Sequence, residues 1–301
     1  MNKWQFTKEQ VIELAKALIE ANVEYMEAGY RADYALFSPL EYGPWRFCEE
    51  KDLSEIYEIT KGKIKLSMMA DIGRTKIESL IPSNESSIDA IRIACYARQI
   101  DEAIIMAERS IDYGYETFIN IMAITIEDMG SIKACLEKIN RLSDLKGLYL
   151  VDSFGSLTMK ETSNLINIYK QACPDLIIGF HGHNNLQLAL ANSLIAAEMG
   201  ATYLDGSCFG MGRGAGNCPL ELLIPQTGKG NSNLGPILET IENWIKPLHS
   251  RLKWGYHLPY VVTGIANSHP SSAINYLKSE ENMPIARFYD SLIKEEANIT
   301  S

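Results

Sequence analysis

The fold of this chain is decided by the stretch Gly210-Met211-Gly212-Arg213-Gly214-Ala215-Gly216-Asn217-Cys218-Pro219-Leu220-Glu221, which follows the last predicted strand. Its glycines allow a close approach of the backbone to a ligand, and Pro219 suits the first turn of a helix. The stretch is a poor dinucleotide-binding fingerprint, because no strand with an acidic ribose partner follows it. In an α/β barrel, however, the last loops and the helix N-terminus after them bind anionic groups. We therefore interpret the stretch as a barrel loop, with an ordinary glycine-rich turn as the alternative.

The rest of the chain alternates between strand-like and helix-like segments. A capping box at Thr7 and Gln10 predicts a first helix that ends near Ala21. Strands that alternate with helices of about 10–15 residues predict a parallel sheet with right-handed crossovers. The predicted strands are 23–28, 64–70, 88–95, 117–123, 148–152, 175–178 and 202–207. Seven strands fit an open doubly wound sheet, or a TIM (β/α)8-type barrel without its first strand, because the chain opens on a helix.

A second informative stretch, Gly179-Phe180-His181-Gly182-His183-Asn184-Asn185, ends the sixth predicted strand. Residues i and i+2 of a strand point to the same side, so His181 and His183 present two imidazoles to one place. Two neutral imidazoles are a ready pair of metal ligands, and a carboxylate would complete a facial set. A histidine on an apolar strand is more often a hydrogen-bonded core residue, so the spacing alone leaves both roles open.

Composition excludes several classes of function. The chain of 301 residues carries a net charge of −10, which argues against nucleic acid or an anionic membrane as the main partner. It has no apolar run of about 18 residues and no signal peptide at its start, so we expect a cytoplasmic protein. Its six cysteines form no Cys-x-x-Cys pair, and we expect reduced thiols.

Four motifs resemble one enzyme family. They are His181-Gly-His183-Asn184-Asn185-Leu186, Ala191-Asn192-Ser193, Asp205-Gly-Ser207 and Gly214-Ala-Gly216-Asn217-x-Pro219-Leu220-Glu221. Together they resemble the 4-hydroxy-2-oxovalerate aldolases, of the metal-dependent superfamily that includes the 3-hydroxy-3-methylglutaryl-CoA lyases and isopropylmalate synthases. The resemblance spans nearly the whole chain and implies a TIM barrel. We predict such a barrel over residues 1–235, without its first strand, and a short helical extension over residues 236–301.

The resemblance also implies a chemistry and a set of site residues. These aldolases bind Mn²⁺ or Mg²⁺, which chelates the 2-keto acid and stabilises the enolate left after carbon–carbon cleavage. His181 and His183 match the two histidine ligands of the family. Tyr260 matches a tyrosine that lines the aldehyde side, and Ser153 matches a position near the keto acid. Asn217 matches an asparagine near the metal of the lyase branch, with a helix N-cap as its alternative role.

Two further residues are assigned to the substrate side of the site. Glu27 lies on the first predicted strand and Arg92 on the third, and we expect them to pair inside the barrel. For Tyr260, a half-buried core position remains the alternative. The aromatic segment 32–51 is predicted to be a long ordered loop, a kind of loop that is often functional.

The chain departs from the family at one place. The family's first strand carries Leu-Arg-Asp-Gly, whose aspartate is the third metal ligand and whose arginine stabilises the enolate. This chain contains no Arg-Asp-Gly, and Asn2-Lys3-Trp4-Gln5-Phe6 resembles the segment just after that motif. Either the true start lies upstream or the chain is a decayed homologue. Loss of such an arginine typically costs about 10²-fold or more in rate, so we expect an open seam between strands 23–28 and 202–207 and little activity.

The predicted function is divalent-metal-dependent cleavage of a 4-hydroxy-2-keto acid to pyruvate and an aldehyde. One alternative is a Claisen-type lyase or synthase that uses an acyl-CoA. Another is a non-catalytic barrel that binds a keto acid or a protein. The expected partner is a small-molecule 2-keto acid, and a homo-oligomer is left open. Some family members dock an aldehyde dehydrogenase through a longer C-terminal region, and the short polar tail 294–301 argues against that partner here.

Overall fold

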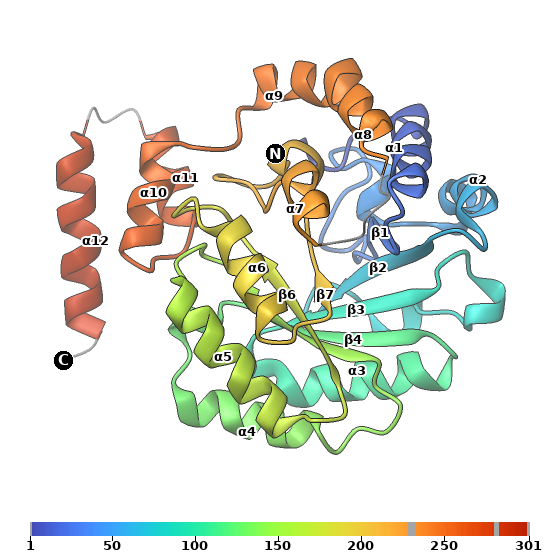
Figure 1. The fold of residues 1–301 in the computed structure, drawn as a ribbon, viewed down its shortest axis with the longest axis horizontal. Helices are drawn as coiled ribbons and strands as arrows, with labels where there is room; N and C mark the ends of the chain where they lie inside the picture. Colours follow the sequence, from blue (N-terminus) through green and yellow to red (C-terminus); the bar gives the residue numbers. More distant parts are fainter. Residues whose placement is uncertain (1, 228–232, 280–282, 300–301) are drawn as a thin grey trace.

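The computed structural model describes residues 2–227, 233–279 and 283–299 of the chain, and the last two residues of the predicted polar tail lie outside these ranges. Seven parallel strands form one sheet in the order of the sequence (Figure 1). They are β1 (Tyr25–Tyr30), β2 (Lys65–Asp71), β3 (Ala90–Cys95), β4 (Glu116–Ile121), β5 (Gly147–Asp152), β6 (Ile177–Gly182) and β7 (Tyr203–Leu204). All seven predicted strands are therefore present, and each pairs only with its neighbours in sequence.

Helices cover the outside of this sheet. Those between or before strands are α1 (Lys8–Glu20), α2 (Glu50–Thr60), α3 (Ile100–Asp112), α4 (Met129–Ile139), α5 (Met159–Ala172) and α6 (Ala189–Glu198). Those after β7 are α7 (Leu220–Gln226), α8 (Gly235–Thr240), the π-helical η7 (Ile241–Ile245), α9 (Lys246–Leu252), α10 (Leu258–Ile265), α11 (Ser271–Lys278) and α12 (Ile285–Ile299). No helix in the described part of the chain is long and apolar enough to cross a bilayer.

The sheet curls until inward-facing rings from distant strands meet. The Tyr25 ring of β1 lies 5.5 Å from the Tyr203 ring of β7, and the Phe118 ring of β4 lies 5.6 Å from the Tyr203 ring. These rings fill the barrel interior near the amino-terminal ends of the strands. The edge strands β1 and β7 nevertheless do not pair with each other. The fold is a TIM-type α/β barrel that is incomplete in the described residues, and the predicted open seam lies between β1 and β7.

The helix layer closes across this seam although the sheet does not. Helix α8 packs beside α1 (Figure 1), and Asn243 of η7 donates a hydrogen bond of 3.0 Å to Glu13 of α1. The Phe6 and Trp244 rings meet edge to face at 5.9 Å. A cavity of about 880 Å³ remains between the two strand edges and the helices outside them. The first helices of the predicted C-terminal extension thus belong to the layer around the barrel.

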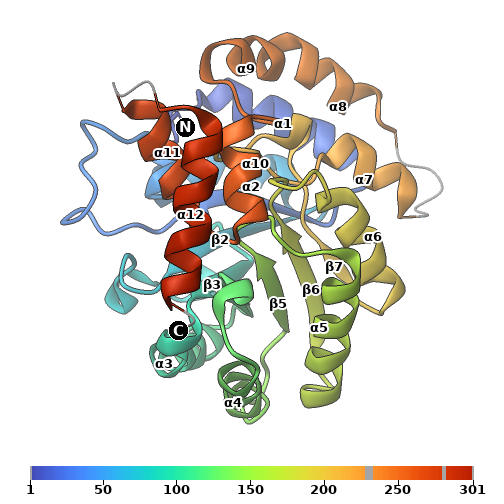
Figure 2. The ribbon, with the colours of Figure 1, turned by 90° about the vertical axis from the view of Figure 1, so that its left-hand side faces the viewer.

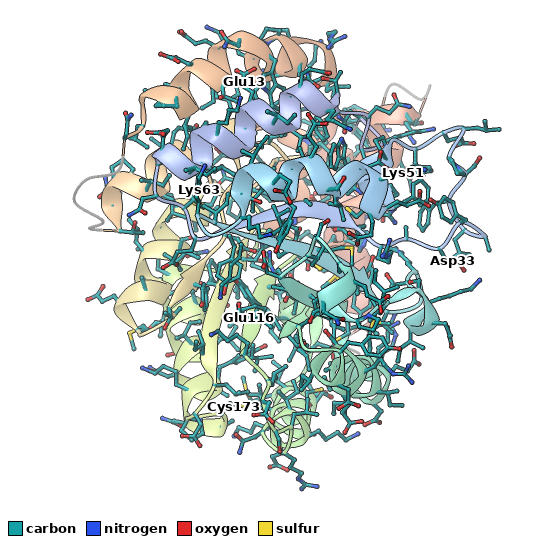
Figure 3. The ribbon with its side chains drawn as sticks, turned by 90° about the vertical axis from the view of Figure 1, so that its right-hand side faces the viewer. Glu13, Asp33, Lys51, Lys63, Glu116 and Cys173 are labelled. Carbon is teal, nitrogen blue, oxygen red and sulfur yellow. The ribbon has the colours of Figure 1, made fainter. Side chains whose placement is uncertain are left out.

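Figure 3 shows the direction of the strands beside α1 and α2. Asp33, in the loop after β1, and Lys51, at the start of α2, lie at one end of the sheet, and Lys63, before β2, lies at the other. In barrels of this class the carboxyl ends of the strands carry the functional loops. We call this end of the barrel the mouth. Figure 2 shows α10, α11 and α12 packed together on one side of the molecule.

Two elements differ from the prediction. Helix α2 was not predicted: its buried positions are only Leu53, Ile56 and Thr60, among charged residues that weaken the apolar periodicity. Strand β7 is shorter than predicted, because the chain leaves the sheet at Asp205, where only a backbone bond to Phe180 continues the pairing. All six cysteines are free and buried in the structure.

Candidate functional site

The two histidines of β6 lie together at the mouth. His181 is inside the strand and His183 follows its last residue. Their ring centroids are 5.3 Å apart and the ring planes are inclined by 75°. The backbone N–H of His183 donates to the carbonyl of Asp152 at the end of β5, which fixes the chain as it leaves the strand. The i and i+2 spacing therefore brings both imidazoles to one place, as the sequence predicts.

Asp205 orients His181. Its Oδ2 lies 2.9 Å from Nδ1 of His181, so Nδ1 carries the shared proton and Nε2 is left for another partner. Burial would raise the pKa of Asp205, but the charges of Arg92 and His181 hold this pKa down at about 2. Asp205 is thus a fixed negative charge behind the imidazole, the arrangement found behind many metal-bound histidines.

His183 is uncharged at neutral pH. Burial lowers the pKa of His183 well below 6.5, and the nearby His181 and Arg213 lower it further. A neutral imidazole keeps a lone pair on one ring nitrogen, and this is the form that binds metals. His183 is therefore suited to be a ligand by its protonation state as well as by its position.

A charged network crosses the open seam inside the barrel. Arg92 of β3 is 9% exposed, and its Nη1 lies 3.0 Å from Glu27 of β1. Its Nη2 lies 2.5 Å from Asp205, and its guanidinium lies 4.3 Å from the centre of the Tyr149 ring. The predicted pairing of Arg92 with Glu27 is confirmed. Burial raises the pKa of Glu27, and the charge of Arg92 opposes this rise. The Glu27 side chain is 29% exposed, at the seam.

Asn217 lies beside His183 and holds one polar atom without a partner. Its Nδ2 donates to the carbonyl of Met211 at 3.0 Å, and its Oδ1 is buried without a hydrogen bond in the described residues. The N-cap of α7 is Pro219, which makes no side-chain cap, so the alternative role of Asn217 as an N-cap is wrong. A Cβ on Gly212 would lie 2.8 Å from the Asn217 amide, which explains the glycine there.

These groups fit a divalent cation only in part. The neighbouring donors are the two imidazoles and the Asn217 oxygen, the last placed by an isolated bridge between His183 and Asn217. The described residues contain no group of three or more His, Cys, Asp or Glu side chains arranged around one metal position. Three neutral donors leave room for an oxygen-rich substrate, but they lack the anionic ligand that hard cations prefer.

Ser153, directly after β5, and Tyr260, in helix α10, both lie outside the cavity at the seam. Ser153 Oγ accepts the backbone N–H of Ala123 at 2.8 Å, so this hydroxyl ties the end of β5 to the turn after β4. The Tyr260 ring covers Gly214, where a Cβ would lie 2.6 Å from a ring carbon and the backbone has a φ of +62°. Burial raises the pKa of Tyr260, and the charge of Arg213 opposes this rise.

The cavity of about 880 Å³ brings four of the predicted residues to one space. They are Glu27, Arg92, His181 and Asn217. Sequence reasoning did not assign site roles to Asp205, Tyr149 or Arg213. Asp205 carried a usable signal, because it begins the Asp205-Gly-Ser207 motif in the last predicted strand. Tyr149 carried none, because an aromatic residue in a buried strand is an ordinary core position.

Comparison with known proteins then fixes the family. A model of the HMGL-like family matches residues 1–233, more than half of the chain. The chain belongs to the HMGL-like family. It is 35% identical over 222 residues to the 4-hydroxy-2-oxovalerate aldolase of Geobacillus thermodenitrificans, covering 73% of this chain and 63% of that protein. The 4-hydroxy-2-oxovalerate aldolase of Moorella thermoacetica is 28% identical over 289 residues, covering 92% of this chain and 82% of that protein.

Two solved structures share the fold. The N-terminal domain of a candidate aldolase from Bacteroides vulgatus superimposes with a TM-score of 0.78 at 28% identity, over 92% of each chain. The HMG-CoA lyase of Bacillus subtilis superimposes with a TM-score of 0.65 at 16% identity, over 83% of this chain and 91% of that one. The latter shows the barrel fold alone. The expectation of an aldolase-like member of this superfamily is confirmed.

Proposed function

We propose that this chain acts as a divalent-metal-dependent aldolase that cleaves a 4-hydroxy-2-keto acid to pyruvate and an aldehyde. The observation that carries the proposal is the pair of neighbouring imidazoles at the end of β6, with Asp205 behind one of them. Relatives named 4-hydroxy-2-oxovalerate aldolase supply the substrate class. The chain spans 63% of the length of the first of these relatives, so the activity in that relative's name is a proposal for this chain.

The site residues divide between two tasks in this proposal. His181, His183 and the free oxygen of Asn217 would hold the cation. The cation, when bound, supplies polarisation of the keto oxygen at C2. Asp205 keeps Nδ1 of His181 protonated, so that Nε2 is the donor atom.

Cleavage itself requires proton movement on the aldehyde side. The hydroxyl at C4 loses its proton to a base, the C3–C4 bond breaks, and its electron pair forms the enolate of pyruvate, which takes a proton at C3. Tyr260, at the mouth with a hydroxyl that stays protonated because burial raises its pKa, orients the C4 hydroxyl. Ser153 keeps a free O–H to donate to the keto acid, because its oxygen accepts from Ala123.

The test is release of pyruvate from 4-hydroxy-2-oxopentanoate by the full chain, with and without Mn²⁺. Pyruvate is followed by its reduction with lactate dehydrogenase and NADH. Because the chain lacks the Arg-Asp-Gly of the family's first strand, we expect slow release that needs the metal and is lost in His181→Ala. The slow release should persist in His249→Ala, a matched histidine on α9 that bonds the carbonyl of Trp254. Absence of pyruvate while Mn²⁺ still binds would reject catalysis and favour a keto-acid-binding barrel. Pyruvate release that requires an acyl-CoA would instead support the Claisen-type alternative.

A further inference from the structure

Arg46 is a buried cation without an anionic partner. It belongs to the short 3-10 helix η1 (Pro44–Arg46), in the loop after β1, and is 8% exposed. Its guanidinium lies 4.0 Å from the Phe37 ring, 4.7 Å from the Tyr30 ring and 5.8 Å from the Trp4 ring. The Arg46 side chain makes no hydrogen bond or ion pair within the described residues, and its Nε is fully buried without an acceptor. Aromatic faces attract a cation, but they do not satisfy its N–H donors.

The carboxylates around this loop are already paired elsewhere. Asp71, at the end of β2, accepts from Arg74 at 2.8 Å. Asp33, labelled in Figure 3, lies 3.0 Å from Lys76. An unpaired charge in a buried place is costly, and proteins usually pair it or expose it. The loop instead holds the Arg46 cation in a fixed cage at the mouth.

Backbone geometry places a second arginine next to Arg46. The N–H of Ala32 donates to the carbonyl of Arg46 at 3.1 Å, and the N–H of the next residue, Asp33, donates to the carbonyl of Arg74 at 2.8 Å. The 3-10 helix reaches this position because Gly29 in β1 has no side chain: a Cβ there would lie 1.9 Å from the Trp45 carbonyl. The loops after β1 and β2 therefore bring the backbones of Arg46 and Arg74 together at one side of the mouth.

The glycine-rich loop after β7 supplies the third arginine. Arg213 is exposed and makes no hydrogen bond or ion pair through its guanidinium in the described part of the chain. Its loop lies against the histidine strand, because the N–H of Asn184 donates to the carbonyl of Gly216 at 2.9 Å. The loop that carries Arg213 therefore borders the same mouth as the loops that carry Arg46 and Arg74, and Arg213 and Arg46 both interact electrostatically with Arg74. Three arginines thus lie in the loops at the mouth of a protein whose net charge is −10.

We propose that Arg46, Arg74 and Arg213 form a subsite for an anionic group, a carboxylate or a phosphate, on the aldehyde half of the substrate. The keto-acid end lies at the histidines, and the arginines lie in loops of the same mouth, so one extended molecule reaches both. The substrate is then an acidic 4-hydroxy-2-keto acid with a second charge at its far end. This identity rests on the proposed function, whereas the anion subsite itself does not.

Binding of simple anions tests the subsite without catalysis. Inorganic phosphate and succinate are titrated into the full chain, with tryptophan fluorescence as the signal, because Trp4 lies against the Arg46 cage. A charge-assisted hydrogen bond contributes about 1.5–3 kcal/mol, so we expect Arg46→Gln to weaken binding about 10-fold or more. Arg213→Gln, an exposed change that leaves packing intact, should weaken it several-fold. Arg141→Gln, an exposed arginine before β5 at the opposite end of the barrel, is the matched control.

The outcomes separate the two proposals. Preferential binding of phosphate identifies a phosphorylated aldehyde half, and preferential binding of succinate identifies a carboxylated one. The subsite would be overturned if neither anion binds. It would also be overturned if the affinity is equal in the parent and in Arg46→Gln, Arg213→Gln and Arg141→Gln. In the synthetic direction, pyruvate is offered with butanal or with a four-carbon aldehyde ending in a carboxylate. Arg213→Gln should lower kcat/KM for the acidic aldehyde alone. Loss of turnover with both aldehydes but retained anion binding would instead count against the aldolase.

Discussion

Arg92→Met is the most direct perturbation of the open seam. Arg92 is nearly buried and is the only described side chain that bonds carboxylates from both seam-facing segments, Glu27 of β1 and Asp205 after β7. Methionine keeps the apolar stem and removes the charge. Both carboxylates then lose the cation between them, and the carboxylates repel each other. The free energy of unfolding should therefore fall, because this network contributes to it.

The size of the loss follows from burial. Removal of one partner from a buried ion pair costs about 3–5 kcal/mol, because a charge stays behind uncompensated. Here the side chains of Glu27 and Asp205 are 29% and 18% exposed, and water in the cavity hydrates them in part. We therefore expect the lower end of that range, about 3 kcal/mol, or about 6 °C in Tm for a domain of this size.

Urea unfolding followed by circular dichroism measures this loss. The triple variant Glu27→Gln/Arg92→Met/Asp205→Asn removes every charge of the network and should recover most of the stability, because neutral replacement of a whole buried pair is nearly free. Lys138→Met, which breaks the exposed pair with Asp101, is the matched control and should cost less than about 1 kcal/mol. The reasoning is refuted if Arg92→Met lies within about 1 kcal/mol of the parent, or if the triple variant is no more stable than Arg92→Met.

Three further changes test separate parts of the account. Asp128→Ala removes the N-cap of α4, whose hydrogen bonds lower the pKa of Asp128. The loss in Tm should therefore be full above pH 3.8 and should vanish as the pH falls through the lowered pKa. A series of Tm measurements over pH on the variant and the parent tests this. Gly29→Ala drives a Cβ into the Trp45 carbonyl and should cost about 2 kcal/mol or more in urea unfolding, whereas Gly62→Ala, with positive φ but open space, should cost about 1 kcal/mol. Tyr260→Phe should leave Tm and Mn²⁺ affinity unchanged while it lowers kcat for pyruvate release; an unchanged kcat would remove Tyr260 from the site.

The sequence predicts most of the barrel because its signals are local and repeated. Each strand from β2 to β6 is buried on both faces and appears as an apolar run, and a capping box marks the start of α1. The i and i+2 spacing of His181 and His183 needs only strand geometry to bring the rings together. The pairing of Glu27 with Arg92 follows once both are placed inside the barrel.

The rest depends on contacts that no local pattern carries. Helix α2 is stabilised by three buried positions on an otherwise charged surface, so its periodicity is weak. The cage around Arg46 joins Tyr30 and Phe37 of one segment to Trp4, which lies far from them in sequence, and Gly29 leaves room for the Trp45 carbonyl next to Arg46. Asn217 shows the same limit: its place before a proline suggests an N-cap, whereas the glycine-rich loop turns its amide toward Met211.

The open seam and the candidate site share one atom. Oδ2 of Asp205 lies 2.5 Å from Nη2 of Arg92 and 2.9 Å from Nδ1 of His181. The Asp205 carboxylate, which pairs with Arg92 at the seam, therefore also fixes the tautomer of His181. Both contacts are possible because β7 ends at Leu204. The chain leaves the sheet at Asp205, and the carboxylate of Asp205 lines the cavity inside the barrel. In this chain the ion pairs across the seam thus link the stability of the barrel to the orientation of its candidate ligand, since Asp205 cannot lose Arg92 without a change in the field at His181.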